Sequence, residues 1–245
     1  MKKILIIGES CRDIFVYCKA NRLCPDIPVP VLGIINQTEN PGMAKNVERN
    51  VKNIEGICDI LTNSNWKDVT KTRYMHNVSN HMFVRVDTDH NIKRINLKDI
   101  SFDYDIIAIS DYNKGFLHEG DIKYICENHN NVFIDTKKVL GDWVSKVKFI
   151  KINNYEYEHS KDSILKGLEN KIICTKGGEG AIFKNKTYPV NKVEVKDTSG
   201  AGDSFFAALL VKYAETEDIE ESIKYANECA SMVVRKKGVS VIEKN

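Results

Sequence analysis

The sequence has little net charge and no long apolar run. Its 36 lysine and arginine residues nearly balance 34 aspartate and glutamate residues, so the formal charge is +2, with no block of one sign. A chain without a basic field has no electrostatic reason to bind nucleic acid. The longest apolar run, residues 205–211, is much too short to cross a bilayer. We therefore expect neither a nucleic-acid partner nor a membrane span.

Several familiar motifs are also missing. The seven cysteines are scattered without a Cys-x-x-Cys pair, and the six histidines show no metal-ligand spacing. We interpret the cysteines as reduced thiols of a cytoplasmic protein. No Gly-x-x-x-x-Gly-Lys-Ser/Thr sequence occurs, which excludes a P-loop protein. A dinucleotide-binding fingerprint is excluded as well, because Gly200-x-Gly202 is followed by Phe205 where that motif requires glycine.

The N-terminus has two lysines and an apolar run that superficially suggest a signal peptide. That run breaks after four residues, at Gly8-Glu9, and therefore predicts a buried strand. No internal repeat or low-complexity linker interrupts the rest of the chain. A length of 245 residues allows a sizeable core, and we expect a single domain over residues 1–245.

Short apolar runs alternate with helical patterns along most of the chain. Such runs are typical of strands buried on both faces of a parallel sheet. The alternation predicts a layered α/β fold with a mainly parallel sheet, in which ligands bind beyond the carboxyl ends of the strands. The expected strands are 4–7, 57–61, 106–109, 132–134, 149–152 and 172–174, and the expected helices are 44–54, 119–128, 155–168, 201–215 and 219–235.

Two stretches depart from this alternation. Residues 15–35 contain several prolines, which favour extended backbone but do not suit a central strand. Residues 71–87 alternate in polarity around a polar turn at Asn77-Val78-Ser79-Asn80 and predict a hairpin. Together they indicate a small β-flap beside the main sheet. An edge hairpin and a moving lid are equally compatible with this pattern.

The stretch from Lys196 to Leu210 has the strongest chemical signal. Gly200, Ala201 and Gly202 have no bulky side chains and precede a helix with one apolar face. A helix start of this kind exposes backbone N–H groups at the positive end of the dipole, which suits a phosphate. A carboxylate at Asp203 would repel a phosphate bound there, so its presence suggests a chemical role. One such role is that of a base that takes a proton from an attacking hydroxyl. The alternative is an ordinary first-turn acid.

Other loops after expected strands carry weaker signals, and each has an ordinary structural alternative. A carboxylate in residues 8–13 could bind sugar hydroxyls, and Asn46, following the turn at Gly42, could bind a polyol. Lys114 could meet a substrate phosphate. Asn153 and Glu156 would share one face of a helical turn and could hold a hydrated Mg²⁺. Residues 175–180 are small and polar enough to approach a nucleotide closely.

Taken in order, these loops resemble the ribokinase-like (PfkB-type) carbohydrate kinases over essentially the full chain. Within them the sequence is most similar to D-glycero-D-manno-heptose 7-phosphate kinases, which act before ADP- or GDP-heptose synthesis. The order of the matches makes the resemblance specific. The matching segments are 26–31, Pro41-Gly42 with Asn46-Val47 and Arg49-Asn50, 84–87, Ser110-Asp111-Tyr112 with Lys114-Gly115, 153–158 and 197–203.

The resemblance implies a three-layer α/β/α fold whose β-flap, about residues 14–36 and 71–88, is a lid that commonly serves as a dimer surface. It implies ATP and Mg²⁺ as cofactors. It also implies a phosphoryl transfer that depends on positioning of the reactants and on electrostatic stabilisation of the transferring phosphate. Asp203 would be the base, and the amides of Gly200, Ala201 and Gly202 would hold the transferring phosphate. Further implied roles are sugar contacts for Asp13, Gly42, Asn46 and Arg85, Mg²⁺ binding for Asn153 and Glu156, nucleotide contacts for Thr175, Gly177, Gly180 and Asn227, and a possible K⁺ site at Asp197, Ser199 and 238–240.

The sequence departs from the family at its periphery. Met43 stands where the family usually has a second glycine, and Glu9 replaces the usual aspartate. The segments after Ile54 and after Glu158 are short. These departures concern the choice of sugar more than the reaction. A nucleoside or small-alcohol kinase, and an inactive sensor of nucleotide or sugar, remain alternatives. We expect any nucleotidyltransferase that uses the product to be a separate chain.

Overall fold

The computed structural model describes residues 2–79, 81–88 and 91–243. Its main sheet has eight strands in the order β12-β11-β10-β9-β8-β7-β1-β4. Pairing is parallel from β4 to β10, whereas the pairs β10–β11 and β11–β12 are antiparallel, so that β11 runs against the other strands of this sheet. The strands are β1 (Lys3–Gly8), β4 (Ile57–Leu61), β7 (Ile106–Asp111), β8 (Val132–Thr136), β9 (Phe149–Asn153), β10 (Ile172–Thr175), β11 (Ala181–Phe183) and β12 (Lys186–Tyr188).

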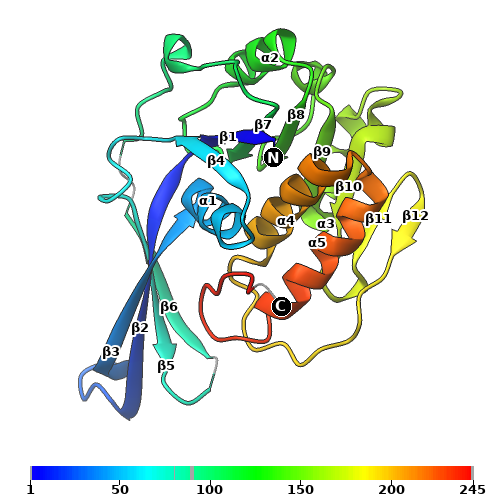
Figure 1. The fold of residues 1–245 in the computed structure, drawn as a ribbon. Coiled ribbons are helices and arrows are strands. Elements are labelled where there is room, and N and C mark those ends of the chain that lie inside the picture. Colours follow the sequence, from blue (N-terminus) through cyan, green and yellow to red (C-terminus); the bar gives the residue numbers. More distant parts are fainter. Residues whose placement is uncertain (1, 80, 89–90, 244–245) are drawn as a thin grey trace.

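Helices cover both faces of this sheet, as the two-sided burial of its strands requires (Figure 1). Ile4 and Ile6 pack in one core with α1, α4 and α5, whereas Leu5 and Ile7 point the opposite way, into a core that includes α2. The three-layer α/β/α prediction is confirmed. The helices are α1 (Ala44–Asn53), α2 (Glu119–Asn128), α3 (Asn154–Ser160), α4 (Ala201–Thr216) and α5 (Ile219–Val233). No helix in the described part of the chain is long and apolar enough to span a bilayer.

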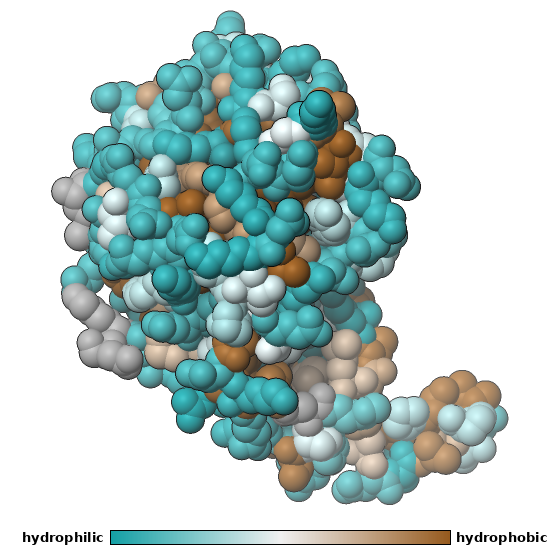
Figure 2. Space-filling model, turned by 90° about the vertical axis from the view of Figure 1, so that its right-hand side faces the viewer, coloured by the Kyte–Doolittle hydropathy of each residue, from teal (hydrophilic) through white to brown (hydrophobic). Residues whose placement is uncertain are grey.

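The flap is a second sheet, with strand order β3-β2-β5-β6, that projects from the body (Figures 1 and 2). Its strands are β2 (Ser10–Leu23), β3 (Pro30–Met43), β5 (Thr70–His76) and β6 (Met82–Asp87). The predicted flap is confirmed, but its first part extends beyond segment 14–36, because a single residue separates β1 from β2 and β3 runs directly into α1. Asn80, placed in the hairpin turn by the sequence pattern, lies outside the described residues.

One predicted helix is too long, and one hairpin was missed. The helix expected over 155–168 ends at Ser160, because Ile164 is extended and Gly167 has a φ of 93°. The hairpin β11–β12 was not predicted, although positive φ values at Lys184 and Asn185 form the kind of tight turn that asparagine favours. Short 3₁₀ helices complete the fold: η1 (Leu97–Asp99), η2 (Asp142–Val144), η3 (Lys161–Ser163), η4 (Leu168–Lys171) and η5 (Gly177–Glu179).

Candidate active site

A cavity of about 720 Å³ lies beyond the carboxyl ends of β8, β9 and β10, against the start of α4. It is where ligands are expected in a parallel α/β sheet. The cavity brings together many of the residues singled out from the sequence, although they come from separate loops. Those lining it are Asn153, Thr175, Gly177, Gly180, Gly200, Ala201, Gly202, Asp203 and Asn227.

The start of α4 has the geometry expected of an anion site. Gly200 is its N-cap and has a φ of 79°, a backbone conformation that favours glycine. A side chain there would also collide with the Asn46 amide, since a Cβ would lie 2.9 Å from Asn46 Nδ2. The Ala201 N–H donates to the Thr198 carbonyl at 3.2 Å, which ties the preceding loop to the helix. First-turn N–H groups, such as that of Gly202, have no partner within the helix.

Asp203 is buried between two hydrogen-bond donors. The Asn46 amide donates to its Oδ2 at 2.9 Å, and the Tyr112 hydroxyl donates to its Oδ1. Burial raises the pKa of Asp203, and the two hydrogen bonds, which favour the ionised form, offset only part of that effect. A carboxylate with a raised pKa that stays close to an anion site suits proton abstraction.

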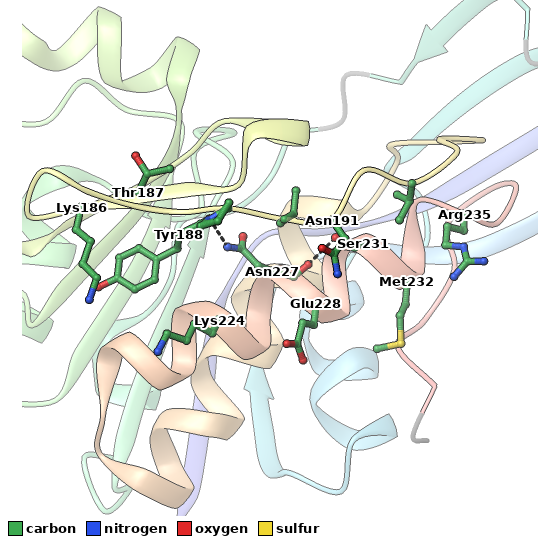
Figure 3. Close-up of a pocket in the computed structure, with 13 residues that line it drawn as sticks. Lys186, Thr187, Tyr188, Asn191, Lys224, Asn227, Glu228, Ser231, Met232 and Arg235 are labelled. Atoms are coloured by element: carbon green, nitrogen blue, oxygen red, sulfur yellow. Dashed lines mark hydrogen bonds between the residues drawn. The ribbon is translucent and has the colours of Figure 1, made fainter.

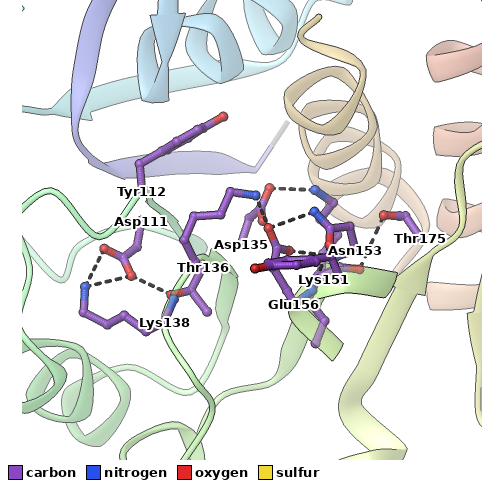
Figure 4. Close-up of polar contacts among 12 residues, drawn as sticks. Asp111, Tyr112, Asp135, Thr136, Lys138, Lys151, Asn153, Glu156 and Thr175 are labelled. Carbon is purple, nitrogen blue, oxygen red and sulfur yellow. Dashed lines mark hydrogen bonds and ion pairs between the residues drawn. The ribbon is translucent and has the colours of Figure 1, made fainter. Parts of the chain in front are cut away.

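Tyr112 is held in place by the loop that follows β7. The buried Glu9 carboxylate accepts the backbone N–H groups of Tyr112 (2.8 Å) and Lys114 (2.9 Å). The neighbouring Asp111 is paired with Lys138 at 2.8 Å, as Figure 4 shows. Glu9, at the position where the family usually has aspartate, therefore orders the loop that presents Tyr112 to Asp203.

Tyr112→Phe is expected to move the acidic limb of the pH dependence of kcat/KM to higher pH. Removing the hydroxyl deletes a hydrogen bond that favours ionised Asp203, so the pKa of Asp203 should rise further. If Asp203 acts as the base, its ionised form then becomes available only at higher pH. A pH–rate profile of both proteins measures the shift. An unchanged limb would show that the Tyr112 hydroxyl does not influence the base.

Asn153 and Glu156 are brought together, as expected from their spacing. Asn153 caps α3 by accepting the Glu156 N–H at 2.9 Å, and Glu156 accepts the Asn153 backbone N–H at 2.8 Å. The Lys137 ammonium also pairs with the Glu156 carboxylate. Burial would lower the pKa of Lys137, but Asp135 and Glu156 outweigh it and raise the pKa overall. Lys137 therefore stays charged beside the cavity.

A buried ion pair lies at the floor of the cavity (Figure 4). The Lys151 ammonium in β9 donates to Asp135 Oδ2 in β8 at 2.7 Å, and both side chains are nearly inaccessible. The other oxygen, Asp135 Oδ1, is buried without a hydrogen-bond partner among the described residues. Lys151 also faces the α4 start, because a Cβ on Gly202 would lie 3.1 Å from its Nζ.

The sugar-side residues gather where the flap meets the body. Asp13 is buried and paired with Arg73 from β5. Gly42 in β3 lies opposite Cys11 in β2, and a Cβ on Gly42 would approach Asp13 Oδ2 to 2.4 Å. The glycine turn expected before α1 is wrong, because residues 40–43 continue β3.

The helix entry instead depends on Met43. Its φ is 60°, a region that favours glycine, and its side chain is buried in the core rather than in the large cavity. Arg85 and Lys114 lie near Asp87. Arg85 binds Asp87 through two hydrogen bonds of 2.7 Å, and that pairing raises the pKa of Arg85, while Lys114 helps to lower the pKa of Asp87.

The residues predicted to contact the nucleotide line the main cavity. Gly180 has a φ of 92°, and a Cβ on it would sit 2.1 Å from the Tyr188 carbonyl, so only glycine fits. Thr175 Oγ1 donates to the Ile152 carbonyl at 3.4 Å. Asn227 in α5 donates to the Tyr188 carbonyl at 2.8 Å and lines both the main cavity and an adjoining one of about 420 Å³ (Figure 3).

The segments proposed to surround a monovalent cation are also adjacent. Asp197 accepts the Ser199 N–H at 2.8 Å with one oxygen and the Gly238 N–H at 3.0 Å with the other. This carboxylate joins the loop before α4 to the segment that follows α5.

Sequence reasoning missed several charged and polar residues of the site. Asp135 and Lys137 follow a predicted strand, so the rule that ligands bind at carboxyl ends could have found them. Lys151 stands inside an apolar run, which is unusual for lysine. Tyr112 belonged to a matched motif but received no role, and Arg73 lay inside the predicted hairpin.

Comparison with known proteins agrees with this fold. A family model described as "pfkB family carbohydrate kinase" matches residues 117–245, more than half of the chain. The bifunctional protein HldE of Helicobacter pylori strain G27 is 28% identical over 97% of this chain and 64% of its own length. The ribokinase of Thermotoga maritima has a TM-score of 0.75 at 18% identity, covering 98% of this chain and 95% of its own. Phosphofructokinase-2 of Escherichia coli in complex with potassium has a TM-score of 0.73 at 14% identity, with coverage of 99% and 96%.

The chain belongs to the pfkB family of carbohydrate kinases, and its fold is ribokinase-like. It is a carbohydrate kinase. The predicted family and class of enzyme are therefore confirmed, whereas the roles of individual residues remain predictions.

Proposed function

We propose that this carbohydrate kinase transfers the terminal phosphate of ATP to a hydroxyl of a sugar phosphate, with a heptose 7-phosphate as the expected substrate. The observation that carries the proposal is the Asp203 carboxylate, buried beside a glycine-rich helix start and within reach of Asn46 and Tyr112. Asp203 takes the proton of the sugar hydroxyl. The first-turn amides at 200–202 stabilise the transferring phosphate, and Lys151 adds a positive charge nearby.

Asp13, Gly42, Asn46, Arg85 and Lys114 are proposed to bind the sugar. The support is their position at the junction of flap and body, on the side where Asn46 touches Asp203. Closure of the flap would exclude water from the reacting groups.

Mg²⁺ fits the donors beside the cavity. Glu156 offers a carboxylate, Asn153 an amide oxygen, and Asp135 Oδ1 is a buried oxygen without a partner among the described residues. Mg²⁺ typically takes one or two carboxylates and keeps several waters. When bound, it would neutralise charge on the nucleotide phosphates. We propose that Thr175, Gly177, Gly180 and Asn227 contact the nucleotide itself.

The remaining proposals extend from the family resemblance. K⁺ would bind near Asp197 and Ser199, where two loops converge. All seven cysteines are unpaired, which supports a reducing, cytoplasmic location. The chain spans 64% of the length of the HldE protein that it matches. We propose that a nucleotidyltransferase uses the phosphorylated product in nucleotide-sugar synthesis for a surface polysaccharide.

The test of the proposed function is ADP release with Mg-ATP across a panel of sugars, sugar phosphates and nucleosides. Turnover of a heptose 7-phosphate above all other acceptors is the expected result. Selective turnover of nucleosides would replace the proposal with a nucleoside kinase. ATP binding without turnover of any acceptor would indicate a sensor.

The flap is proposed to form a homodimer through its end. Ile27, Val29, Ile34 and Ile35 are exposed there, and Figure 2 shows apolar residues at the end of the projecting arm. An apolar patch of this kind is typical of an association surface. The double variant Ile34→Asp, Ile35→Asp is expected to convert a dimer to a monomer in sedimentation velocity. A wild-type protein that sediments as a monomer at all concentrations would contradict the proposal.

A further inference from the structure

One face of the flap carries an unusual concentration of charge. In the antiparallel pair β5–β6, Lys71 lies opposite Asp87 and Arg73 lies opposite Arg85. In the parallel pair β2–β5, Asp13 is level with Lys71. Side chains of residues directly opposite one another share a face of the sheet. Two carboxylates and three cations therefore project from the same side.

The arginines are neutralised within this face, whereas the lysines are not. Arg73 pairs with Asp13, and Arg85 pairs with Asp87. Lys71 forms no ion pair with any residue that the structure describes; its ammonium lies 4.7 Å from the centre of the Tyr112 ring. Lys114, from the loop after β7, also has no ion pair within the described ranges. Together the four cations exceed the two carboxylates by two charges.

These two lysines line one small cavity. Lys71, Lys114 and Asp87 surround a space of about 110 Å³ together with Met43. The pKa of Asp87 is lowered chiefly by Arg85, with further contributions from Lys71 and Lys114, so the cations lie close together. The local field is positive beside the residues proposed to bind the sugar.

Lys71 lies close to Asp203, with the Tyr112 side chain between them. Tyr112 donates its hydroxyl to Asp203, and Lys71 lies against the ring of the same side chain. The base and the Lys71 ammonium are thus separated by little more than one tyrosine side chain, a span comparable with the length of a sugar. A substrate whose hydroxyl reaches Asp203 can place a substituent at its far end beside Lys71.

We propose that Lys71 and Lys114 form a phosphate subsite that selects sugars already carrying a phosphate monoester. This inference rests on the proposed function and specifies how the substrate is recognised. The two uncompensated positive charges match a phosphate monoester, whose charge at neutral pH is about −1.5 to −2. Ammonium groups contact phosphate through charge-assisted hydrogen bonds. Lys114 was singled out from the sequence, whereas Lys71 is assigned only from the structure.

The experiment compares D-glycero-D-manno-heptose 7-phosphate with the unphosphorylated heptose as acceptors. The variants are Lys71→Gln, Lys114→Gln and the double variant, with the exposed Lys98→Gln as a matched control for loss of one charge. Loss of a charge-assisted contact is expected to raise KM for the phosphorylated sugar about 10- to 100-fold per lysine. The KM for the phosphorylated sugar divided by the KM for the unphosphorylated sugar should therefore rise in these variants. The control should keep the wild-type ratio.

A binding measurement separates this inference from the proposed function. Inorganic phosphate, added without ATP, should raise the unfolding temperature of the wild type more than that of the double variant, because ligand binding stabilises the folded state. Equal effects of the variants on both sugars would overturn the subsite and leave the kinase proposal intact. If the wild type rejects every sugar phosphate, the substrate proposal fails. In that case, equal stabilisation of the wild type and the double variant by phosphate would overturn the subsite as well. A rise of the unfolding temperature in the wild type alone would support an anion site at Lys71 and Lys114.

Discussion

Asp203→Asn is expected to lower kcat for sugar phosphorylation by about 10²- to 10⁴-fold, the range typical of a lost general base. An amide of the same shape cannot accept the hydroxyl proton. It can still receive a hydrogen bond from Tyr112 or Asn46, which both contact the carboxylate in the wild type. Steady-state ADP release on the best acceptor measures the change.

The matched control is Asp103→Asn, which removes an exposed carboxylate that does not line the main cavity. The Asp203 variant should remain folded, because burial raises the pKa of this carboxyl and its ionised form is therefore costly to bury. The unfolding midpoint in urea tests this. A folded Asp203→Asn enzyme with a kcat close to that of the wild type would remove Asp203 from the role of base.

Lys151→Met is expected to reduce the free energy of unfolding by about 3–5 kcal/mol, the usual cost of leaving one partner of a buried ion pair uncompensated. Asp135 would keep a buried charge, and its Oδ1 already lacks a donor among the described residues. Equilibrium urea denaturation measures the loss. The control is Lys98→Met, which removes an exposed lysine and should change stability by less than about 0.5 kcal/mol.

The double variant Lys151→Met, Asp135→Leu separates the buried charge from simple loss of packing. Replacing both partners by apolar residues of similar size often restores stability, so the double variant should be more stable than Lys151→Met alone. A single variant that loses less than about 1 kcal/mol would contradict the view that this pair is strongly desolvated.

The fold was largely predictable because its strands are short apolar runs buried on both sides. Runs such as 4–7 and 106–109 fit no other environment in a chain of this composition. The predicted helix over 155–168 was wrong because periodicity does not show where a glycine such as Gly167 will adopt a positive φ. The hairpin β11–β12 was missed because strands of three residues carry too little pattern.

The candidate site was predictable only in part. Asp203 and Asn46 were both selected from local motifs, but they are 157 residues apart, and no pattern in the sequence places them in contact. Tyr112 contacts Asp203 at the start of α4, and Lys151 pairs with Asp135 on the neighbouring strand, so both contacts emerge only from the folded structure.

The way the flap joins the body restricts how this enzyme can diverge. A single residue, Glu9, separates β1 from β2, and none separates β3 from α1. Because side chains alternate between the faces of a strand, inserting one residue at either junction would turn the face of the flap that is proposed to bind the sugar away from the body. Homologues should therefore conserve chain length at residues 8–10 and 42–44, and gaps in their alignments should concentrate in the bend at 24–29.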